Sequence, residues 1–425
     1  MILTRRSFGG LCLATAAAGA AGAAHAQEPV CTFRRLQAEG LYLPQYLELK
    51  GKAAAGDEPA RWQLSQYAAF LGDEEAAIGS VASPRPPTAP LPDLTGASVE
   101  DALDVIAEAA ADRRIVILNE AHNHSRHRGF AAQVMRRLRP LGFDWFAAEA
   151  FMPRQPEPAP CITEYRPGMP FLQAYGYYSR DPVLAETVRE AARLGYRFAD
   201  YEFRADQYAP EGSDMDTRMA YREEAQAENL IADLLAPHPE AKVFVYCGYS
   251  HAMEAPTDHG EWFASRLKRK TGVDPLTIDQ AYGAPDLQPE NDEPHVAAVL
   301  AAHAPDRPVI VRRADGSVVG MPLYDGQLDL SVIHPRLAPV AGRPGWLAAD
   351  PERRAVEVNV PAFEGRALLQ TMWAGEGAGA VPADQFLLKP DQTQATVLLH
   401  PGSYFLRLET QRGIEPAYGE IRVEP

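Results

Sequence analysis

The run Arg114-Ile-Val-Ile-Leu-Asn-Glu-Ala-His122 decides how this chain folds. Its first half, Ile115 to Leu118, is apolar throughout, as expected for a strand that is covered on both faces of a sheet. A glutamate and a histidine, Glu120 and His122, follow directly. The run therefore predicts a buried parallel strand that brings two titratable side chains to its carboxyl end.

The segments after this run repeat the pattern. Short apolar runs alternate with amphipathic helices, which is typical of an α/β fold with a mainly parallel sheet flanked by helices. We expect strands at residues 114–118, 145–148, 196–199, 242–246 and 275–278, and helices at residues 98–111, 128–138, 181–194, 217–235 and 262–270.

Composition and periodicity divide the rest of the chain. Apolar residues at helical spacing predict a helical N-terminal segment at 27–83, and closely spaced prolines mark a Pro-rich linker at 84–97. The α/β domain follows at 98–338. From 343 to 425, alternating strands with Pro or Gly turns predict a small all-β sandwich domain. Its strands are expected at 355–360, 367–372, 395–400, 404–409 and 418–423.

Residues 1–26 have the features of a twin-arginine signal peptide. Arg5 and Arg6 stand in Thr4-Arg-Arg-Ser-Phe8, a short alanine-rich run follows, and Ala24-His-Ala26 is a small-x-small cleavage site. We therefore expect a periplasmic or secreted protein whose mature chain begins at Gln27. Without the two signal arginines, the 41 basic residues fall to 39 against 57 acidic ones, a net charge of −18. That charge argues against nucleic acid as a partner, and no later segment predicts a transmembrane span.

The cysteines and the absence of three common enzyme motifs say less about the function. Cys31 and Cys161 could pair in an oxidising compartment, whereas Cys247 lies in an apolar strand, where a core thiol is expected. The sequence has no GxSxG elbow, no GxGxxG that opens a helix and no GxxxxGK[ST] loop. A common serine hydrolase, a dinucleotide-binding enzyme and a P-loop protein are therefore not expected. The oligomeric state is left open.

Acids and histidines gather at the ends of the expected strands. Glu120 and His122 follow the first strand, Glu149 the second, Glu202 the third and His251 the fourth. Ligands of open α/β sheets bind outside these carboxyl ends. We therefore expect a catalytic cluster of Glu120, His122, Glu149 and His251. A carboxylate beside an imidazole can activate water by proton abstraction or by metal ligation, so the same four residues are the candidate ligands of a divalent metal.

Further residues are expected to contact the substrate. His127 and Arg128 crowd the turn after the first strand, and Glu202 ends the third. Their positions beside the catalytic cluster place them within reach of a ligand bound there.

Three motifs resemble those of the erythromycin esterase-like and ChaN-like (Tiki/TraB-related) superfamily. They are Ile115-Val-Ile-Leu-Asn-Glu-Ala-His122, Phe146-Ala-Ala-Glu149 and Gly248-Tyr-Ser-His251, with the family's glycine before the first glutamate replaced by Asn119.

A fourth stretch, Tyr221-Arg-Glu-Glu-Ala-Gln-Ala-Glu-Asn229, is similar to a helical motif of the same family. The resemblance implies that Arg222 and Asn229 face the site, and their separation of two helical turns puts them on one helix face. The resemblance covers about 170 residues and leaves the helical N-terminal segment and the β sandwich outside it.

The resemblance implies an exported hydrolase. His122, supported by Glu120, would activate water for attack on an ester or amide carbonyl of a small-molecule or peptide substrate. Two alternatives stay open at this point. One is a periplasmic haem or small-ligand binding protein, for which an apolar face would come from Phe151, Met152, Tyr175, Tyr177 and Tyr178. The other is a metal-dependent Tiki-like protease.

Overall fold

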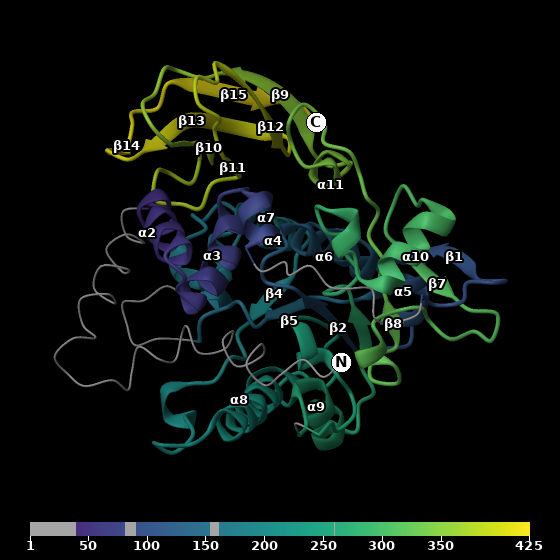
Figure 1. The fold of residues 1–425 in the computed structure, drawn as a ribbon. Coiled ribbons are helices and arrows are strands. Elements are labelled where there is room, and N and C mark those ends of the chain that lie inside the picture. The colour runs from purple at the N-terminus through teal and green to yellow at the C-terminus, as the bar shows by residue number, and fades with distance from the viewer. Residues whose placement is uncertain (1–39, 81–90, 154–160, 259) are drawn as a thin grey trace.

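The computed structural model describes residues 40–80, 91–153, 161–258 and 260–425 and is built around one six-stranded sheet (Figure 1). The strand order is β4-β3-β5-β2-β6-β8, and every neighbouring pair is parallel. The strands are β2 (Ile115–Glu120), β3 (Trp145–Ala148), β4 (Arg197–Ala199), β5 (Val243–Gly248), β6 (Leu276–Asp279) and β8 (Leu330–Ser331). The predicted parallel α/β sheet is confirmed, and β8 is a strand that the sequence did not predict.

Helices cover both faces of this sheet. One face carries α6 (Ser125–Leu138) and α7 (Pro182–Arg193), and the other carries α8 (Met215–Leu230) and α9 (Phe263–Thr271). Successive side chains of a strand point to opposite faces. In β5, Phe244 and Tyr246 therefore pack with α6 and α7, whereas Val243 and Val245 pack with α8 and α9. Because both faces are covered, this strand is apolar without alternation.

The path of the chain brings three strand ends together. After β2 the chain passes over one strand position to β3, continues to β4, and then returns so that β5 fills the gap between β2 and β3. From β5 it crosses β2 to reach β6. Such a reversal is a topological switch point, where α/β sheets form a crevice at the carboxyl ends of their strands. The loops after β2, β3 and β5 therefore meet at one edge of the sheet.

A smaller unit flanks the β8 side of the sheet. It consists of β1 (Ser98–Asp101), α5 (Ala102–Ala110), α10 (Pro294–His303) and β7 (Val309–Arg312). β1 and β7 form an antiparallel pair. The sequence predicted a helix from Ser98, but Asp101 caps the helix instead, because its carboxylate accepts the backbone N–H groups of Leu103 and Asp104. The residues before Asp101 are left extended and pair with β7.

The C-terminal part is an antiparallel β sandwich, preceded by the short helix α11 (Gly345–Ala348). Its strands are β9 (Arg354–Asn359), β10 (Ala367–Trp373), β11 (Asp384–Leu387), β12 (Gln394–Leu399), β13 (Gly402–Thr410), β14 (Gly413–Ile414) and β15 (Gly419–Val423). β9 pairs with β12, and the other strands form a second sheet. Leu369, Val397 and Leu406 belong to one apolar cluster shared by both sheets. The all-β prediction is confirmed, but the sequence missed β11 and β14, which are short.

Three helices stand before the linker and pack between the β sandwich and the α/β domain: α2 (Leu43–Ala54), α3 (Glu58–Phe70) and α4 (Glu74–Gly79). Glu409 of β13 is fully buried, and its Oε1 accepts the backbone N–H groups of Tyr42 at 2.8 Å and Leu43 at 2.7 Å. Gln385 of β11 donates to the carbonyl of Phe70 at 2.7 Å. The β sandwich therefore holds both the start of α2 and the end of α3.

Some sequence predictions fall outside the described residues, namely the signal peptide at 1–26, Cys31 with the rest of residues 27–39, and the first half of the Pro-rich linker. Cys161, the cysteine that could pair with Cys31, is a free and buried thiol, as is Cys247. No helix in the described part of the chain has the length and apolar content needed to cross a membrane. The division of the chain into independent domains stays a prediction.

Candidate active site

The structure brings the four side chains of the expected catalytic cluster together at the carboxyl edge of the sheet. Glu120 ends β2, Glu149 directly follows β3, and His251 lies in the 3₁₀ turn η8 (Tyr249–Ala252) after β5. His122 Nδ1 is 2.8 Å from Glu120 Oε1, and His251 Nε2 is 3.6 Å from Glu149 Oε1. None of the four side chains is more than 7% exposed. Residues that are distant in sequence therefore share one nearly closed site.

Glu120 and His122 form the first carboxylate–imidazole pair. The Glu120 carboxylate also accepts Arg128 Nε at 2.9 Å and the Tyr246 hydroxyl at 2.8 Å. Burial raises the pKa of Glu120, but the Arg128 guanidinium and the hydrogen bond from His122 outweigh burial and lower the pKa to about 2. An ionised Glu120 can only accept from His122 Nδ1. This contact fixes the tautomer and leaves Nε2 of His122 as the proton acceptor.

His251 is held in the same way by Glu223, which the sequence analysis did not place in the site. Nδ1 of His251 is 2.8 Å from Glu223 Oε1, and Glu223 Oε2 accepts the backbone N–H of Phe263 at 2.7 Å. Glu223 shares the buried face of α8 with Ala227 and Leu230, at positions i, i+4 and i+7. A carboxylate in an otherwise apolar helical stripe was the signal that could have identified it.

Glu149 and Arg222 lie beside Nε2 of His251. Glu149 Oε2 accepts the backbone N–H of Gly248 at 2.6 Å, and Glu149 Oε1 accepts Arg222 Nη2 at 2.6 Å. Arg222 Nη1 is 3.5 Å from His251 Nε2, and Arg222 Nε donates to Glu202 at 3.0 Å. Burial raises the pKa of Glu149, but the charges of His251 and Arg222 hold it well below its usual range. Glu149 is therefore an anion at neutral pH.

Gly248 allows His122 to approach β5 closely. A Cβ atom at Gly248 would lie 2.6 Å from His122 Nε2 and 3.1 Å from Glu149 Oε2. Because both atoms lie within these distances of one point, they are at most 5.7 Å apart. A single water can bridge such a gap. The next residue, Tyr249, has a φ of 42°, in the left-handed region that residues other than glycine rarely adopt. Strain of this kind is concentrated at functional sites.

His127 and Arg128, which were expected to contact the substrate, are fully buried. Arg128 contacts Glu120, and His127 Nδ1 accepts the backbone N–H of Ala121 at 3.1 Å. In this structure both side chains support the first carboxylate–imidazole pair from within the protein. Direct contact with a substrate stays a prediction for both.

Arg222, Glu202 and Asn229 lie on the more open side of the site. The side chains of Arg222 and Glu202 are 12% and 14% exposed. Asn229 Nδ2 donates to the backbone carbonyl of Glu202 at 3.0 Å and thereby fixes the loop that follows β4. Arg222 and Glu202 are placed to meet a ligand that enters from this side, and their substrate contacts likewise stay predictions.

Asn119, which replaces the family's glycine, connects three parts of the sheet edge. Its Nδ2 donates to the carbonyl of Tyr249 at 3.0 Å and to Asp279 Oδ1 at 2.9 Å, and its Oδ1 accepts the backbone N–H of Gln280 at 2.8 Å. Asn119 therefore joins the ends of β2 and β6 to the strained turn after β5, a role that a glycine could not fill.

The donor arrangement does not fit a metal ion. Among the described residues, no group of three or more His, Cys, Asp or Glu side chains is placed to hold one. The Arg222 guanidinium contacts Glu149 and lies 3.5 Å from His251 Nε2, so it occupies the place that a cation between these two ligands would need. We therefore derive no catalytic step through a metal.

The aromatic residues that were candidates for a haem-binding face are used elsewhere. Phe151 and Tyr175 belong to the apolar core that α6 and α7 form with the sheet. Tyr177 packs against α3, and Tyr178 stacks on the imidazole of His122. These side chains do not form one open apolar face, so the haem alternative gains no support from them.

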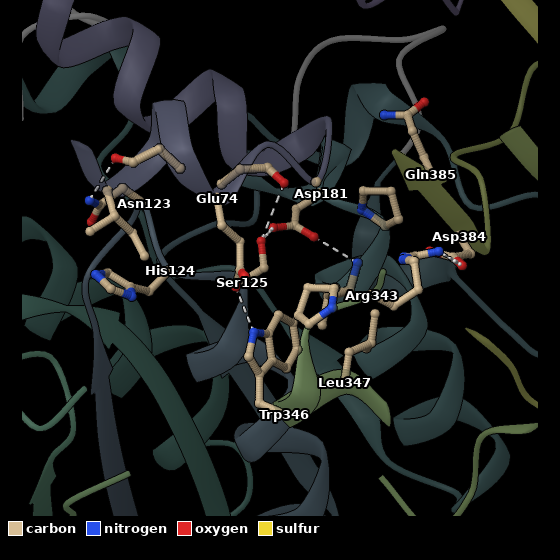
Figure 2. Close-up of a pocket in the computed structure, with 17 residues that line it drawn as sticks. Glu74, Asn123, His124, Ser125, Asp181, Arg343, Trp346, Leu347, Asp384 and Gln385 are labelled. Atoms are coloured by element: carbon tan, nitrogen blue, oxygen red, sulfur yellow. Dashed lines mark hydrogen bonds and ion pairs between the residues drawn. The ribbon is translucent and has the colours of Figure 1, made fainter. Parts of the chain in front are cut away.

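A small hollow lies where the helical segment, the start of α6 and the β sandwich meet (Figure 2). In its wall, Ser125 Oγ donates to Asp181 Oδ2 at 2.5 Å, and Asp181 also accepts the Arg128 guanidinium. Trp346 of α11 lies on another side of the hollow. The network that supports Glu120 therefore extends through Arg128 and Asp181 to this junction.

No protein-family model matches the chain, and no curated protein matches it. Solved structures match in part. A structure described as bacterial protein toxins is 15% identical over 44% of this chain and 38% of that chain, with a TM-score of 0.32. The type III effector HopBA1 is 16% identical over 41% of this chain and 81% of that chain, with a TM-score of 0.30. RRSP, a MARTX toxin effector domain from Vibrio vulnificus CMCP6, is 14% identical over 41% of this chain and 37% of that chain, with a TM-score of 0.27.

The chain spans only 38% and 36% of the first two matching structures. Similarity at this level says nothing about activity. Membership of the erythromycin esterase-like and ChaN-like superfamily therefore stays a prediction that rests on the motifs alone.

Proposed function

We propose that this protein is an exported hydrolase in which His122 activates water for attack on an ester or amide carbonyl. One observation supports the proposal most. Two imidazoles, His122 and His251, are each anchored through Nδ1 by a buried carboxylate, and the Nε2 atoms of both lie close to Glu149. One imidazole can accept a proton while the other donates one, which is what hydrolysis with a poor leaving group requires.

The charges around the two imidazoles suggest which one is the acid. His251 has two carboxylates within 3.6 Å, Glu223 at Nδ1 and Glu149 at Nε2, and the Arg222 guanidinium 3.5 Å from Nε2 offsets part of their charge. His122 contacts one carboxylate, Glu120 at Nδ1, whose charge Arg128 offsets, and Glu149 lies within 5.7 Å of its Nε2. The two carboxylates in contact with His251 favour this ring as the one that delivers a proton to the leaving group. We assign His251 as the general acid and His122 as the general base.

The reaction then proceeds in two proton transfers. Nε2 of His122 takes a proton from water as the water oxygen forms a bond to the carbonyl carbon. Negative charge develops on the carbonyl oxygen, and the guanidinium of Arg222 can stabilise it. When the bond to the leaving group breaks, Nε2 of His251 donates its proton to the departing oxygen or nitrogen. Proton exchange with water restores both imidazoles.

A substrate panel tests this proposal. The purified protein is assayed with p-nitrophenyl esters of increasing acyl length and with the matching p-nitroanilides. His122→Ala and His251→Ala should each lower kcat/KM by roughly 10²-fold or more. His303→Ala is the matched control, because His303 is exposed in α10 and lies outside the site. Hydrolysis that survives both site variants, or that falls equally in the control, would contradict the assignment.

A further inference from the structure

One face of the His122 imidazole is covered by an aromatic ring that belongs to neither carboxylate–imidazole pair. The Tyr178 ring stacks on it with centroids 4.1 Å apart and an interplanar angle of 16°. The Tyr249 ring packs against the imidazole edge to face, with centroids 5.3 Å apart and an interplanar angle of 89°. The hydrogen bond to Glu120 fixes only one atom of the imidazole, so the ring could still tilt about that bond. The flat contact with Tyr178 sets the plane of the ring and therefore the direction of Nε2.

Tyr178 begins the 3₁₀ turn η5 (Tyr178–Arg180), and the N-terminal helices hold this turn at both ends. At one end the Tyr178 hydroxyl donates to Gln66 Oε1 of α3 at 3.4 Å. At the other end the hydroxyl of Tyr42, which precedes α2, donates to the Arg180 carbonyl at 3.1 Å. Tyr178 also packs against the apolar cluster of these helices. The position of the Tyr178 ring therefore depends on the helical segment.

The helical segment depends in turn on the β sandwich. Glu409 binds the backbone N–H groups of Tyr42 and Leu43, and Gln385 binds the carbonyl of Phe70. Tyr42 is thus fixed by the sandwich through its backbone and contacts the Tyr178 turn through its side chain. A continuous set of contacts runs from the β sandwich through α2 and α3 to His122.

We propose that Tyr178 is a positioning residue for His122, and that the helical segment and the β sandwich form a clamp that keeps Tyr178 against the imidazole. The role of His122 as a base rests on the proposed function, whereas the clamp itself does not. The two parts of the chain that lie outside the α/β domain are then components of the active site.

The test uses the full mature chain labelled with ¹³C and ¹⁵N at histidine. NMR reports the environment of His122 Cε1–H, whose signal is shifted by the ring current of the stacked Tyr178 ring, and the ¹⁵N shifts report which ring nitrogen carries the proton. Tyr178→Leu removes the ring and should move the Cε1–H signal, whereas the tautomer, which Glu120 fixes, should stay the same. The variant should lower kcat by roughly 10-fold with KM changed far less, since only the direction of Nε2 is lost.

Two variants control this experiment. Tyr178→Phe keeps the ring and should restore both the NMR signature and most of kcat. Tyr208→Leu changes a tyrosine that is 52% exposed and should alter neither. Glu409→Gln perturbs the clamp from the sandwich and should move the His122 signals in the same direction as Tyr178→Leu, by less.

The outcomes separate the clamp from the hydrolase proposal. If the wild-type protein hydrolyses no substrate of the panel, Glu409→Gln still decides the question, because this variant keeps the Tyr178 ring and moves the His122 signals only if the clamp sets the imidazole. Unchanged His122 signals in Tyr178→Leu would overturn the inference, whatever the activity. Moved signals with unchanged kcat would overturn the positioning role and leave a purely structural contact.

Discussion

Replacing Gly248 with alanine should disable the site while sparing the fold. Gly248 has a φ of −88° and a ψ of 141°, an extended conformation that alanine adopts without strain. The backbone conformation therefore does not require glycine here. Glycine is required because there is no room for a side chain: an added Cβ would lie 2.4 Å from His122 Cε1 and 2.6 Å from His122 Nε2.

The size of the effect follows from ordinary contact distances. Carbon atoms in contact are separated by about 3.5–4.0 Å, so the imidazole has to move by roughly 1 Å. His122 is tied to Glu120 and stacked on Tyr178, so the movement breaks or distorts one of these contacts. A displacement of about 1 Å at a reacting group costs roughly 10²-fold in rate, or about 2.7 kcal/mol of activation free energy. Overpacking should lower the free energy of unfolding by about 1–3 kcal/mol.

The assay compares kcat/KM on the best ester of the panel with the urea midpoint of unfolding. Gly51→Ala is the control, because a Cβ at Gly51 in α2 meets no atom within 4 Å. This control should keep full activity and gain about 1 kcal/mol of stability, since alanine favours a helix over glycine. Gly248→Ala with activity within twofold of wild type, and unchanged NMR signals of His122, would refute the geometry on which the proposed site rests.

Three further predictions follow from individual contacts. Glu223→Gln should lower kcat by roughly 10²-fold with little change in the thermal midpoint, because a neutral amide cannot stabilise the His251 imidazolium; unaffected kcat would argue against His251 as the acid. Burial raises the pKa of Glu409 from its ordinary value of 4.5 to about 7, more than its backbone hydrogen bonds and Arg407 lower it. The folded state thus keeps this proton to higher pH than the unfolded chain, so stability should fall by up to about 3 kcal/mol as pH rises from about 4.5 to about 7. The free energy of unfolding, measured with urea, should fall with pH in the wild type and should lose this pH dependence in Glu409→Gln. Replacing Arg5 and Arg6 with lysine should retain the precursor in the cytoplasm, because the export pathway reads paired guanidinium groups. Cell fractionation measures this, and normal export of the variant would exclude the twin-arginine pathway.

The sheet could be predicted because burial on both faces leaves a strong pattern. β2, β3 and β5 are short apolar runs, and the predicted strands overlap the observed ones. The prediction was weaker where a side chain decides the local structure. Asp101 caps α5 three residues after Ser98, where the sequence predicted the helix to start. β8 and β14 have only two residues each, too few for any pattern.

The members of the site could be expected at strand ends, but their supports could not. Glu120, His122, Glu149 and His251 follow strands directly, so topology alone predicts that they meet. Glu223 lies on a helix and reaches His251 only because α8 and η8 pack together on one face of the sheet. Tyr178 reaches His122 because its turn, η5, packs against the apolar cluster of α2 and α3 and is hydrogen-bonded to Gln66 of α3. Such contacts depend on the packing of distant segments. A local pattern marks Glu223 as a buried carboxylate, but nothing local in the sequence names His251 as its partner or Tyr178 as the partner of His122.

The balance of charge around the site gives a physical reason for its proposed chemistry. Four carboxylates share two guanidinium groups, since Arg128 contacts Glu120 and Asp181 and Arg222 contacts Glu149 and Glu202. A fifth carboxylate, Glu223, contacts His251 instead. Burying a carboxylate is costly unless its oxygens have partners. Besides the guanidinium groups, these carboxylates accept hydrogen bonds from backbone N–H groups, a tyrosine hydroxyl and imidazoles. In the proposed reaction a proton moves to His122 or from His251 inside a nearly closed site whose carboxylates outnumber its guanidinium groups. These charges are in place before any substrate binds, so they stabilise the positive charge that develops on the imidazole in that reaction.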